Sequence, residues 1–294
     1  MKKPAEKIKR IGLIGNSQKV PFARTLRNAA KLVRAARRQV FSDASTAALA
    51  GIDAIVYPDV AGLSRAVDLL LVFGGDGTML RVARELDGSV TPILGINIGN
   101  LGFLTAVPST ELAMGLKQIW AGEYTFEERV LIEAGAHCDG KLYARRAFND
   151  FVVARSNGSR LIELEVSVDG EPVTRYRCDG LIISSPTGST AYSLAAGGAV
   201  ADPRAEVFQL TPICPHTLTN RSLILPLTSV IEVKVITPEP PCLLSADGQV
   251  VSELSAGDAI TIRRSRKSVR LMQLNGNSFF KTLRQKLHWR GANL

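Results

Sequence analysis

The chain has 294 residues, of which 46% are hydrophobic, and a formal net charge of +9. This length accommodates two domains, and the hydrophobic content excludes an intrinsically disordered chain. No apolar run reaches the ~18–20 residues of a membrane-spanning helix, and the first apolar segment predicts a strand rather than a signal peptide. The four cysteines lie far apart and form no CxxC pair, so we expect free thiols in a cytoplasmic protein.

The first part of the chain alternates predicted strands and helices. In chain order, strands are expected at residues 9–14, 54–57, 67–73 and 91–96. Helices are expected at residues 22–38, 78–86 and 111–120. Alternation at this spacing predicts an α/β domain over residues 1–128, with a parallel sheet and helices on its faces.

The helix predicted at residues 22–38 carries much of the positive charge. Its apolar residues recur at helical spacing, which predicts a buried stripe and a basic face. The basic residues are Arg24, Arg27, Lys31, Arg34, Arg37 and Arg38. A solvated face is the first interpretation, and attraction of anionic nucleotides is the second. No DNA- or RNA-binding module signature is present, so we expect no nucleic-acid partner.

Strands dominate from residue 129. Residues 162–168 alternate apolar and polar side chains and end at Asp169-Gly170, a hairpin signal. Residues 230–236, 259–262 and 269–272 have a similar pattern. We therefore predict an all-β domain over residues 129–272, as a sandwich or a stack of sheets. A short helix is expected within the C-terminal segment, residues 273–294.

A glycine-rich turn follows the apolar run 67–73. Gly74, Gly75, Gly77 and Thr78 surround the carboxylate of Asp76. Glycines let a backbone approach a ligand closely, and free N–H groups before a helix form an anion site, so we expect phosphate binding here. Phosphate repels a carboxylate, so Asp76 should hold a metal or accept a proton. The alternative is a tight turn with a solvated side chain.

Three further segments carry glycine or polar residues at positions where a ligand could bind. A second glycine-bearing loop spans residues 97–104, after a predicted strand. Asn149 and Asp150 interrupt an apolar run, either to hold sugar hydroxyls or to form a turn. Residues 179–193 contain a hydroxyl-rich stretch that would either cap a helix or recognise a purine and a ribose. The Walker, GxGxxG and protein-kinase signatures are missing, which makes a metal more necessary for handling phosphate.

The turn Gly74-Gly75-Asp76-Gly77-Thr78 resembles the signature shared by diacylglycerol kinases, sphingosine kinases, phosphofructokinases and NAD kinases. Residues 97–104, 149–150, 179–193, 212–217 and 247–249 together resemble NAD kinases in particular. The resemblance implies an α/β domain, a β-rich domain and a C-terminal segment returning to the first. It also implies transfer of the γ-phosphate of ATP, or in some members of polyphosphate, to the 2′-hydroxyl of the adenosine ribose of NAD.

The resemblance further implies roles for individual residues. Asp76 is the expected proton acceptor, and Arg177 is expected to favour NAD over NADH. The residues expected to bind NAD are Asp76, Gly77, Asn149, Asp150, Arg160, Arg177, Asp179, Thr187, Thr190, Ala191, Tyr192, Ser193, Leu194, Ala195, Asp247 and Gln249. A divalent ion, Mg²⁺ or Mn²⁺, should arrive with the nucleotide rather than on a protein site, and the family forms dimers or tetramers.

Two other functions are compatible with the glycine-rich turn. One is a lipid or sugar kinase of the same superfamily, which the 149–150 and 179–193 segments disfavour. The other is a dinucleotide sensor without catalysis, which the presence of Asp76 disfavours.

Overall fold

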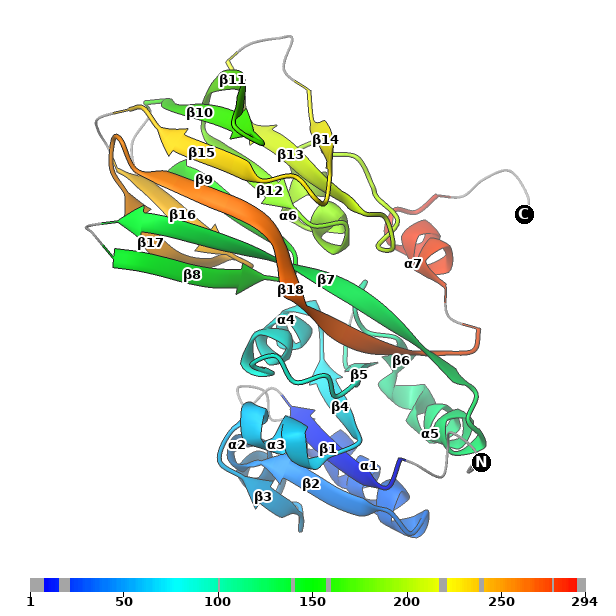
Figure 1. The fold of residues 1–294 in the computed structure, drawn as a ribbon. Coiled ribbons are helices and arrows are strands. Elements are labelled where there is room, and N and C mark those ends of the chain that lie inside the picture. Colours follow the sequence, from blue (N-terminus) through cyan, green and yellow to red (C-terminus); the bar gives the residue numbers. More distant parts are fainter. Residues whose placement is uncertain are drawn as a thin grey trace. The chain divides into compact units, whose positions relative to one another are not determined.

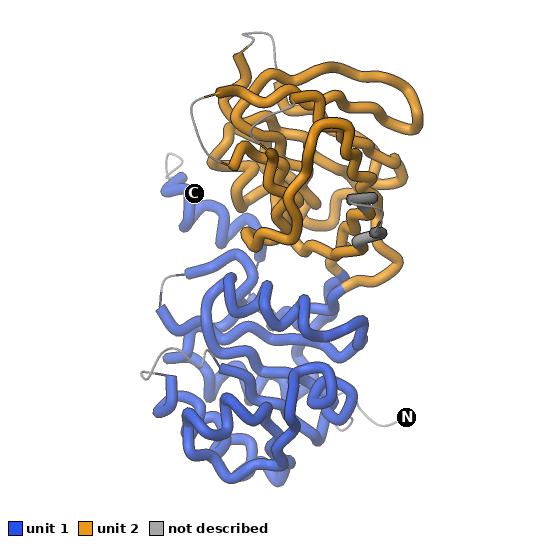
Figure 2. Tube along the Cα trace, turned by 90° about the vertical axis from the view of Figure 1, so that its left-hand side faces the viewer, with its two compact units in different colours: residues 1–128, 269–294 blue, residues 129–268 orange. Residues whose placement is uncertain are grey.

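The computed structural model describes residues 8–15, 22–99, 101–138, 141–156, 160–216, 221–237, 241–276 and 278–289. The chain forms two compact units, shown in Figure 2. Unit 1 comprises residues 1–128 and 269–294, and unit 2 comprises residues 129–268. Two long strands, β7 (Tyr124–Cys138) and β18 (Ala259–Leu274), carry the chain from one unit into the other.

Unit 1 contains a parallel sheet in the order β5-β4-β1-β2-β3, as predicted. The strands are β1 (Arg10–Gly15), β2 (Gln39–Asp43), β3 (Ile55–Tyr57), β4 (Leu69–Gly74) and β5 (Ile93–Asn97), with β6 (Val107–Pro108) beside β5. Every residue of β4 is buried, which explains its uninterrupted apolar sequence. The strand β2 was not predicted, because only two of its five residues are large and apolar.

Helices of unit 1 follow the strands (Figure 1). They are α1 (Phe22–Ala35), α2 (Ala44–Ala50), α3 (Val60–Ala66), α4 (Asp76–Glu85), the 3₁₀ helix η2 (Ser109–Glu111), α5 (Leu112–Ala121) and α7 (Phe279–Lys286). The predicted amphipathic character of α1 is confirmed, because Phe22, Leu26 and Val33 are buried in the core. The two helices missed from sequence, α2 and α3, have seven residues each and start at aspartate caps.

Unit 2 is β-rich, as predicted. One antiparallel sheet has the order β14-β13-β12-β9-β16-β17, and β11, β10, β15 and the first part of β18 form a second antiparallel series. Side chains from both sheets share one hydrophobic core. The strands are β8 (Lys141–Ala147), β9 (Asp150–Arg155), β10 (Ile162–Val168), β11 (Glu171–Cys178), β12 (Gly180–Ser184), β13 (Val207–Ile213), β14 (Leu223–Pro226), β15 (Ile231–Val235), β16 (Cys242–Ala246) and β17 (Gln249–Leu254).

Two of the hairpins turn through residue pairs with positive φ. Asp169-Gly170, the predicted hairpin, has φ values of 53° and 84° and joins β10 to β11. Asp247-Gly248 has φ values of 48° and 76° and joins β16 to β17. Such pairs suit the tight turns that match the twist of antiparallel strands. The two strands predicted at 259–262 and 269–272 are one continuous strand, because the polar residues between them remain extended.

Candidate functional site

The carboxylate of Asp76 is held by the backbone of the second glycine-bearing loop. Asp76 is the first residue of α4, directly after the N-cap Gly75. Its two carboxylate oxygens accept hydrogen bonds from the N–H groups of Phe103 and Leu104, each at 2.9 Å. The two glycine-bearing loops of unit 1, which sequence reasoning treated as separate signals, are therefore joined through this one side chain.

Gly102 is required for this arrangement. A Cβ atom at Gly102 would lie 2.1 Å from Oδ1 of Asp76, far inside van der Waals contact. The loop can approach the carboxylate only because residue 102 has no side chain. Residue 100 of the same loop lies outside the described residues.

The glycines of the turn have different surroundings. A Cβ at Gly74 would lie 2.2 Å from the hydroxyl of Thr78, so the threonine side chain occupies that space. Nothing lies within 4 Å of a Cβ at Gly75 or Gly77, so these two positions leave room for a ligand. The N–H of Thr78 donates to the carbonyl of Gly75 at 3.0 Å. Of the residues predicted to bind phosphate, Gly75 and Gly77 at the helix start are the best placed to meet an anion, and their contact with phosphate stays a prediction.

In unit 2, the carboxylate of Asp247 organises the segment before β9. It accepts hydrogen bonds from the N–H of Phe148, at 3.0 and 3.1 Å, and from the N–H of Asn149 at 2.7 Å. A longer contact of 3.4 Å joins it to the N–H of Asp150. The N–H of Asp247 in turn donates to the carbonyl of Asp150 at 3.1 Å. Asp247, expected to bind NAD directly, thus shapes the backbone of the expected NAD-binding pair.

The segment at Asn149 is also fixed from its other side. The N–H of Ser185 donates to the carbonyl of Asn149 at 2.8 Å, and the Ser185 hydroxyl donates to the carbonyl of Phe148 at 2.7 Å. A Cβ at Gly188 would lie 2.2 Å from the Asn149 carbonyl oxygen. Three motifs far apart in sequence, at residues 149–150, 185–188 and 247, therefore meet in unit 2.

The carboxyl group of Asp150 stays protonated, and therefore neutral, to a higher pH than an ordinary aspartate. Asp150 is only 4% exposed. Burial, and then the nearby charge of Asp247, raise its pKa to about 7. At neutral pH, Asp150 therefore titrates and can either donate or accept a hydrogen bond.

Most hydroxyls of the 184–193 stretch are bonded within the protein. Ser189 donates to the carbonyl of Pro186 at 2.7 Å, and Ser193 bonds to the hydroxyl of Thr211 at 2.9 Å. Thr190 bonds to the carbonyl of Thr187 at 3.3 Å. The helix expected here is a 3₁₀ turn, η3 (Thr187–Thr190), followed by the single-turn helix α6 (Tyr192–Ala195). These hydroxyls therefore help to fold the segment, and the expected contact of Thr187, Thr190 and Ser193 with NAD stays a prediction. Tyr192, 48% exposed, remains open to a ligand.

Asp179 pairs with an arginine that sequence reasoning missed. Its carboxylate lies 2.9 Å from Nε of Arg155 at the end of β9. Asp179 lies between β11, which ends at Cys178, and β12, which begins at Gly180. Arg177 and Arg160 are both exposed. Their contact with NAD, like that of Ala191, Leu194, Ala195 and Gln249, stays a prediction.

Among the described residues, no group of three or more histidine, cysteine or acidic side chains is placed to hold a metal ion. The buried cysteines are also unsuited to such a role, because burial raises the pKa of Cys178 to about 12 and that of Cys242 to about 11. No helix in the described part of the chain is long and apolar enough to cross a bilayer.

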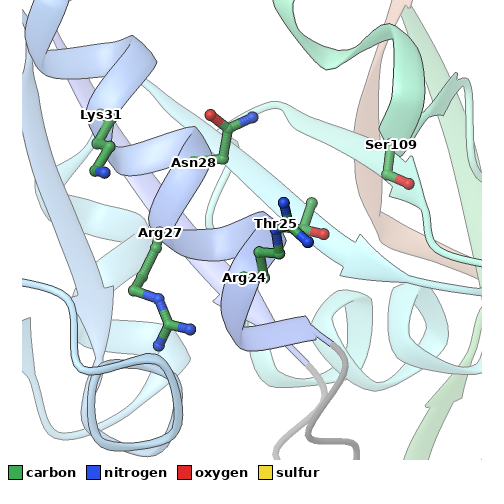
Figure 3. A pocket seen from close by; sticks show the side chains of 6 residues that line it. All are labelled: Arg24, Thr25, Arg27, Asn28, Lys31 and Ser109. Carbon is green, nitrogen blue, oxygen red and sulfur yellow. The ribbon is translucent and has the colours of Figure 1, made fainter.

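The basic face of α1 lines a pocket, shown in Figure 3. The pocket has a volume of about 440 Å³. Its lining residues are Arg24, Thr25, Arg27, Asn28, Lys31 and Ser109. Arg27 is anchored by a 3.0 Å hydrogen bond to the carbonyl of Ala50, and the lining includes no carboxylate. The predicted basic face is confirmed for Arg24, Arg27, Lys31 and Arg34, whereas Arg37 and Arg38 lie beyond the end of α1 at Ala35. This face lies on a different element from the glycine turn.

Family models and a relative of known family both match this chain to NAD kinases. The model of the ATP-NAD kinase N-terminal domain matches residues 13–124, and that of the C-terminal domain matches residues 148–274. The chain is 38% identical to an NAD kinase of Syntrophotalea carbinolica, covering 96% of this chain and 99% of that protein.

Two solved structures have a similar fold. One is a yeast NADH kinase in complex with NADH, 24% identical, with a TM-score of 0.89 over 98% of this chain and 89% of that one. The other is an Archaeoglobus fulgidus NAD kinase in complex with ATP, 26% identical, with a TM-score of 0.73 over 96% of this chain and 100% of that one.

The raised pKa of Asp150 predicts how stability depends on pH. The folded protein holds this proton up to about pH 7, whereas the unfolded chain releases it near the ordinary aspartate pKa of 3.8. The folded state therefore binds more protons, and the contribution of Asp150 to stability falls as pH rises between about 4 and 7. Asp150→Asn should remove this loss. Its free energy of unfolding should exceed that of wild type by on the order of 2–4 kcal/mol, with the difference growing from pH 5 to pH 8.

Urea unfolding followed by far-ultraviolet circular dichroism at several pH values measures this difference. Asp53→Asn, which changes an exposed carboxylate with a side chain 99% accessible, is the matched control and should keep the wild-type pH dependence. Parallel stability curves for Asp150→Asn and wild type would show that Asp150 is not protonated in the folded protein.

Proposed function

The chain belongs to the ATP-NAD kinase family and phosphorylates NAD with ATP, and we propose that the γ-phosphate goes to the 2′-hydroxyl of the adenosine ribose with Asp76 as the proton acceptor. The observation that carries the proposal is the carboxylate at the start of α4, fixed by two backbone N–H groups beside glycines that leave room for phosphate.

Asp76 can be held by the loop and still accept a proton. A carboxylate has two oxygens with about four lone-pair sites, and the N–H groups of Phe103 and Leu104 use one site on each oxygen. The remaining sites are available to a substrate hydroxyl. A ribose hydroxyl is a much weaker acid than a carboxylic acid, so Asp76 need not form an alkoxide first. In a loose transition state the proton leaves late, and the main task of Asp76 is to orient the attacking oxygen.

Charge on the transferred phosphoryl group is proposed to be met from two sources. The first is the helix start, where the N–H groups of residues 75–77 and the helix dipole favour an anion. The second is a divalent ion, Mg²⁺ or Mn²⁺, that enters as part of the nucleotide substrate. The second source is needed because the chain has no Walker lysine beside this turn.

NAD recognition is proposed to rest on unit 2. The backbone of Asn149 and Asp150 is held by Asp247 on one side and by Ser185 on the other, so their Cα atoms have fixed positions. Asp179, fixed by Arg155, and the exposed ring of Tyr192 add a charged group and a stacking surface. The resemblance to the family also supports a homo-oligomer, dimeric or tetrameric, in the cytoplasm.

Asp76→Asn should fold normally and lower kcat by at least ~10²-fold, the range expected when a general base is lost. The amide retains an oxygen for one loop N–H but cannot take the proton. NADP formation from NAD and Mg·ATP, read with an NADP-dependent dehydrogenase, measures the effect. Asp53→Asn, an exposed carboxylate of unit 1, should retain full activity. Near-normal turnover of Asp76→Asn would remove Asp76 from the chemistry.

Activity should vanish when EDTA removes divalent ions and return when Mg²⁺ or Mn²⁺ is added in excess. The reason is that phosphate charge otherwise lacks a cation at the glycine turn. The same coupled assay, with the dehydrogenase checked separately in EDTA, gives the measurement. Full NAD phosphorylation in chelator would contradict the proposed source of charge neutralisation.

A further inference from the structure

The C-terminal helix α7 contacts the loop that holds Asp76. The ring of Phe279 lies against the ring of Phe103, with centroids 6.4 Å apart and planes inclined by 42°. The ammonium group of Lys286 lies 5.7 Å from the centroid of the same Phe103 ring, within the range of a cation–π interaction. Two residues of α7 therefore contact one side chain of the loop, and all of them belong to unit 1.

The contacting residues form one face of α7. Phe279, Leu283 and Lys286 are spaced at i, i+4 and i+7, so they project from the same side of the helix. Leu283 in the middle of this face is 4% exposed, whereas Phe279 is half-buried and Lys286 is exposed. The helix start is fixed by the Ser278 hydroxyl, which accepts the N–H of Lys281 at 3.1 Å. The position of α7 is thus set by an N-cap and a buried leucine as well as by Phe103.

Phe103 is the link between α7 and the carboxylate. Its side chain contacts α7, while its N–H donates to Oδ2 of Asp76 at 2.9 Å. The next residue, Leu104, supplies the second donor and is itself 7% exposed. The ring contacts restrain the backbone of Phe103, so their loss would leave the loop that carries both donors freer to move. Misplacing a catalytic group by ~1 Å can lower a rate by ~10²-fold, so small shifts of this loop matter.

We propose that α7 is a positioning element for phosphoryl transfer: Phe279 and Lys286 hold Phe103, and through its backbone they fix the Asp76 carboxylate toward the attacking hydroxyl. This inference rests on the proposed role of Asp76. It makes Phe279 and Lys286 positioning residues, which act on turnover through Asp76 rather than by touching the substrate.

The test is a double-mutant cycle with Asp76. Lys286→Met and Phe279→Ala are each made in wild-type protein and in Asp76→Asn. Lys281→Met, which changes another exposed lysine of α7, is the matched control. Lys286→Arg and Phe279→Tyr keep the cation and the ring. For each variant, kcat, both KM values, the melting temperature and amide hydrogen exchange at residues 101–104 are measured.

We expect Lys286→Met to lower kcat by ~2–5-fold, matching an exposed cation–π contact, and Phe279→Ala to lower it by roughly tenfold. Both KM values should change by less than about twofold. Exchange of the Phe103 and Leu104 amides should become faster, and Lys281→Met and the two conservative variants should resemble wild type. In the Asp76→Asn background neither change should lower the residual kcat further, because the group they position is gone.

The proposal is overturned if both variants keep wild-type kcat, or if they lower kcat by the same factor in the Asp76→Asn background. A rise in KM alone would also overturn it, since Phe103 would then act in substrate binding. Full activity of Asp76→Asn would overturn the role of Asp76 and this inference with it. The two failures can be told apart by amide exchange. If only the role of Asp76 is wrong, Phe279→Ala would still speed exchange at Phe103 and Leu104, which would show that α7 orders the loop.

Discussion

The hydrogen bonds between the Asp76 carboxylate and the N–H groups of Phe103 and Leu104 are the constraint on which the proposed phosphoryl-transfer site of unit 1 depends. They require a helix that starts at residue 76, and Gly74 at the end of β4 leaves room for the side chain of Thr78 in the first turn of that helix. They also require a loop that comes close to the carboxylate, so residue 102 must be glycine. One side chain thereby fixes two loops at the carboxyl ends of neighbouring parallel strands, where α/β sheets place their ligands.

Unit 2 contains the same kind of interaction, a carboxylate that accepts hydrogen bonds from backbone N–H groups. Asp247, on a tight turn with positive φ, accepts from Phe148 and Asn149. Charge-assisted hydrogen bonds of this kind are stronger than neutral ones, so they hold the segment without a long helix or strand. The arrangement places a second carboxyl group, Asp150, beside Asp247 in a buried position, and this proximity contributes to the raised pKa of Asp150.

The fold class and the glycine turn were predictable, because they depend on local patterns: the apolar run of β4, the periodicity of α1 and the Asp169-Gly170 hairpin. The pairing of Asp179 with Arg155 was not predictable, since it depends on two strands adjacent in the sheet but distant in sequence. The internal hydrogen bonds of Ser189 and Ser193 were not predictable for a similar reason. A hydroxyl-rich sequence has the same composition whether its partners are ligand atoms or the backbone of its own turn.

The most direct test of this account is the single-turnover rate of NADP formation in Gly102→Ala at saturating NAD and Mg·ATP. The added Cβ must displace either the loop or the Asp76 carboxylate, because the two would otherwise be 2.1 Å apart. The account predicts a fall of about 10²-fold in the folded variant, with the dissociation constant of NAD changed by less than about threefold. A wild-type rate would show that catalysis does not depend on the hydrogen bonds that hold the Asp76 carboxylate.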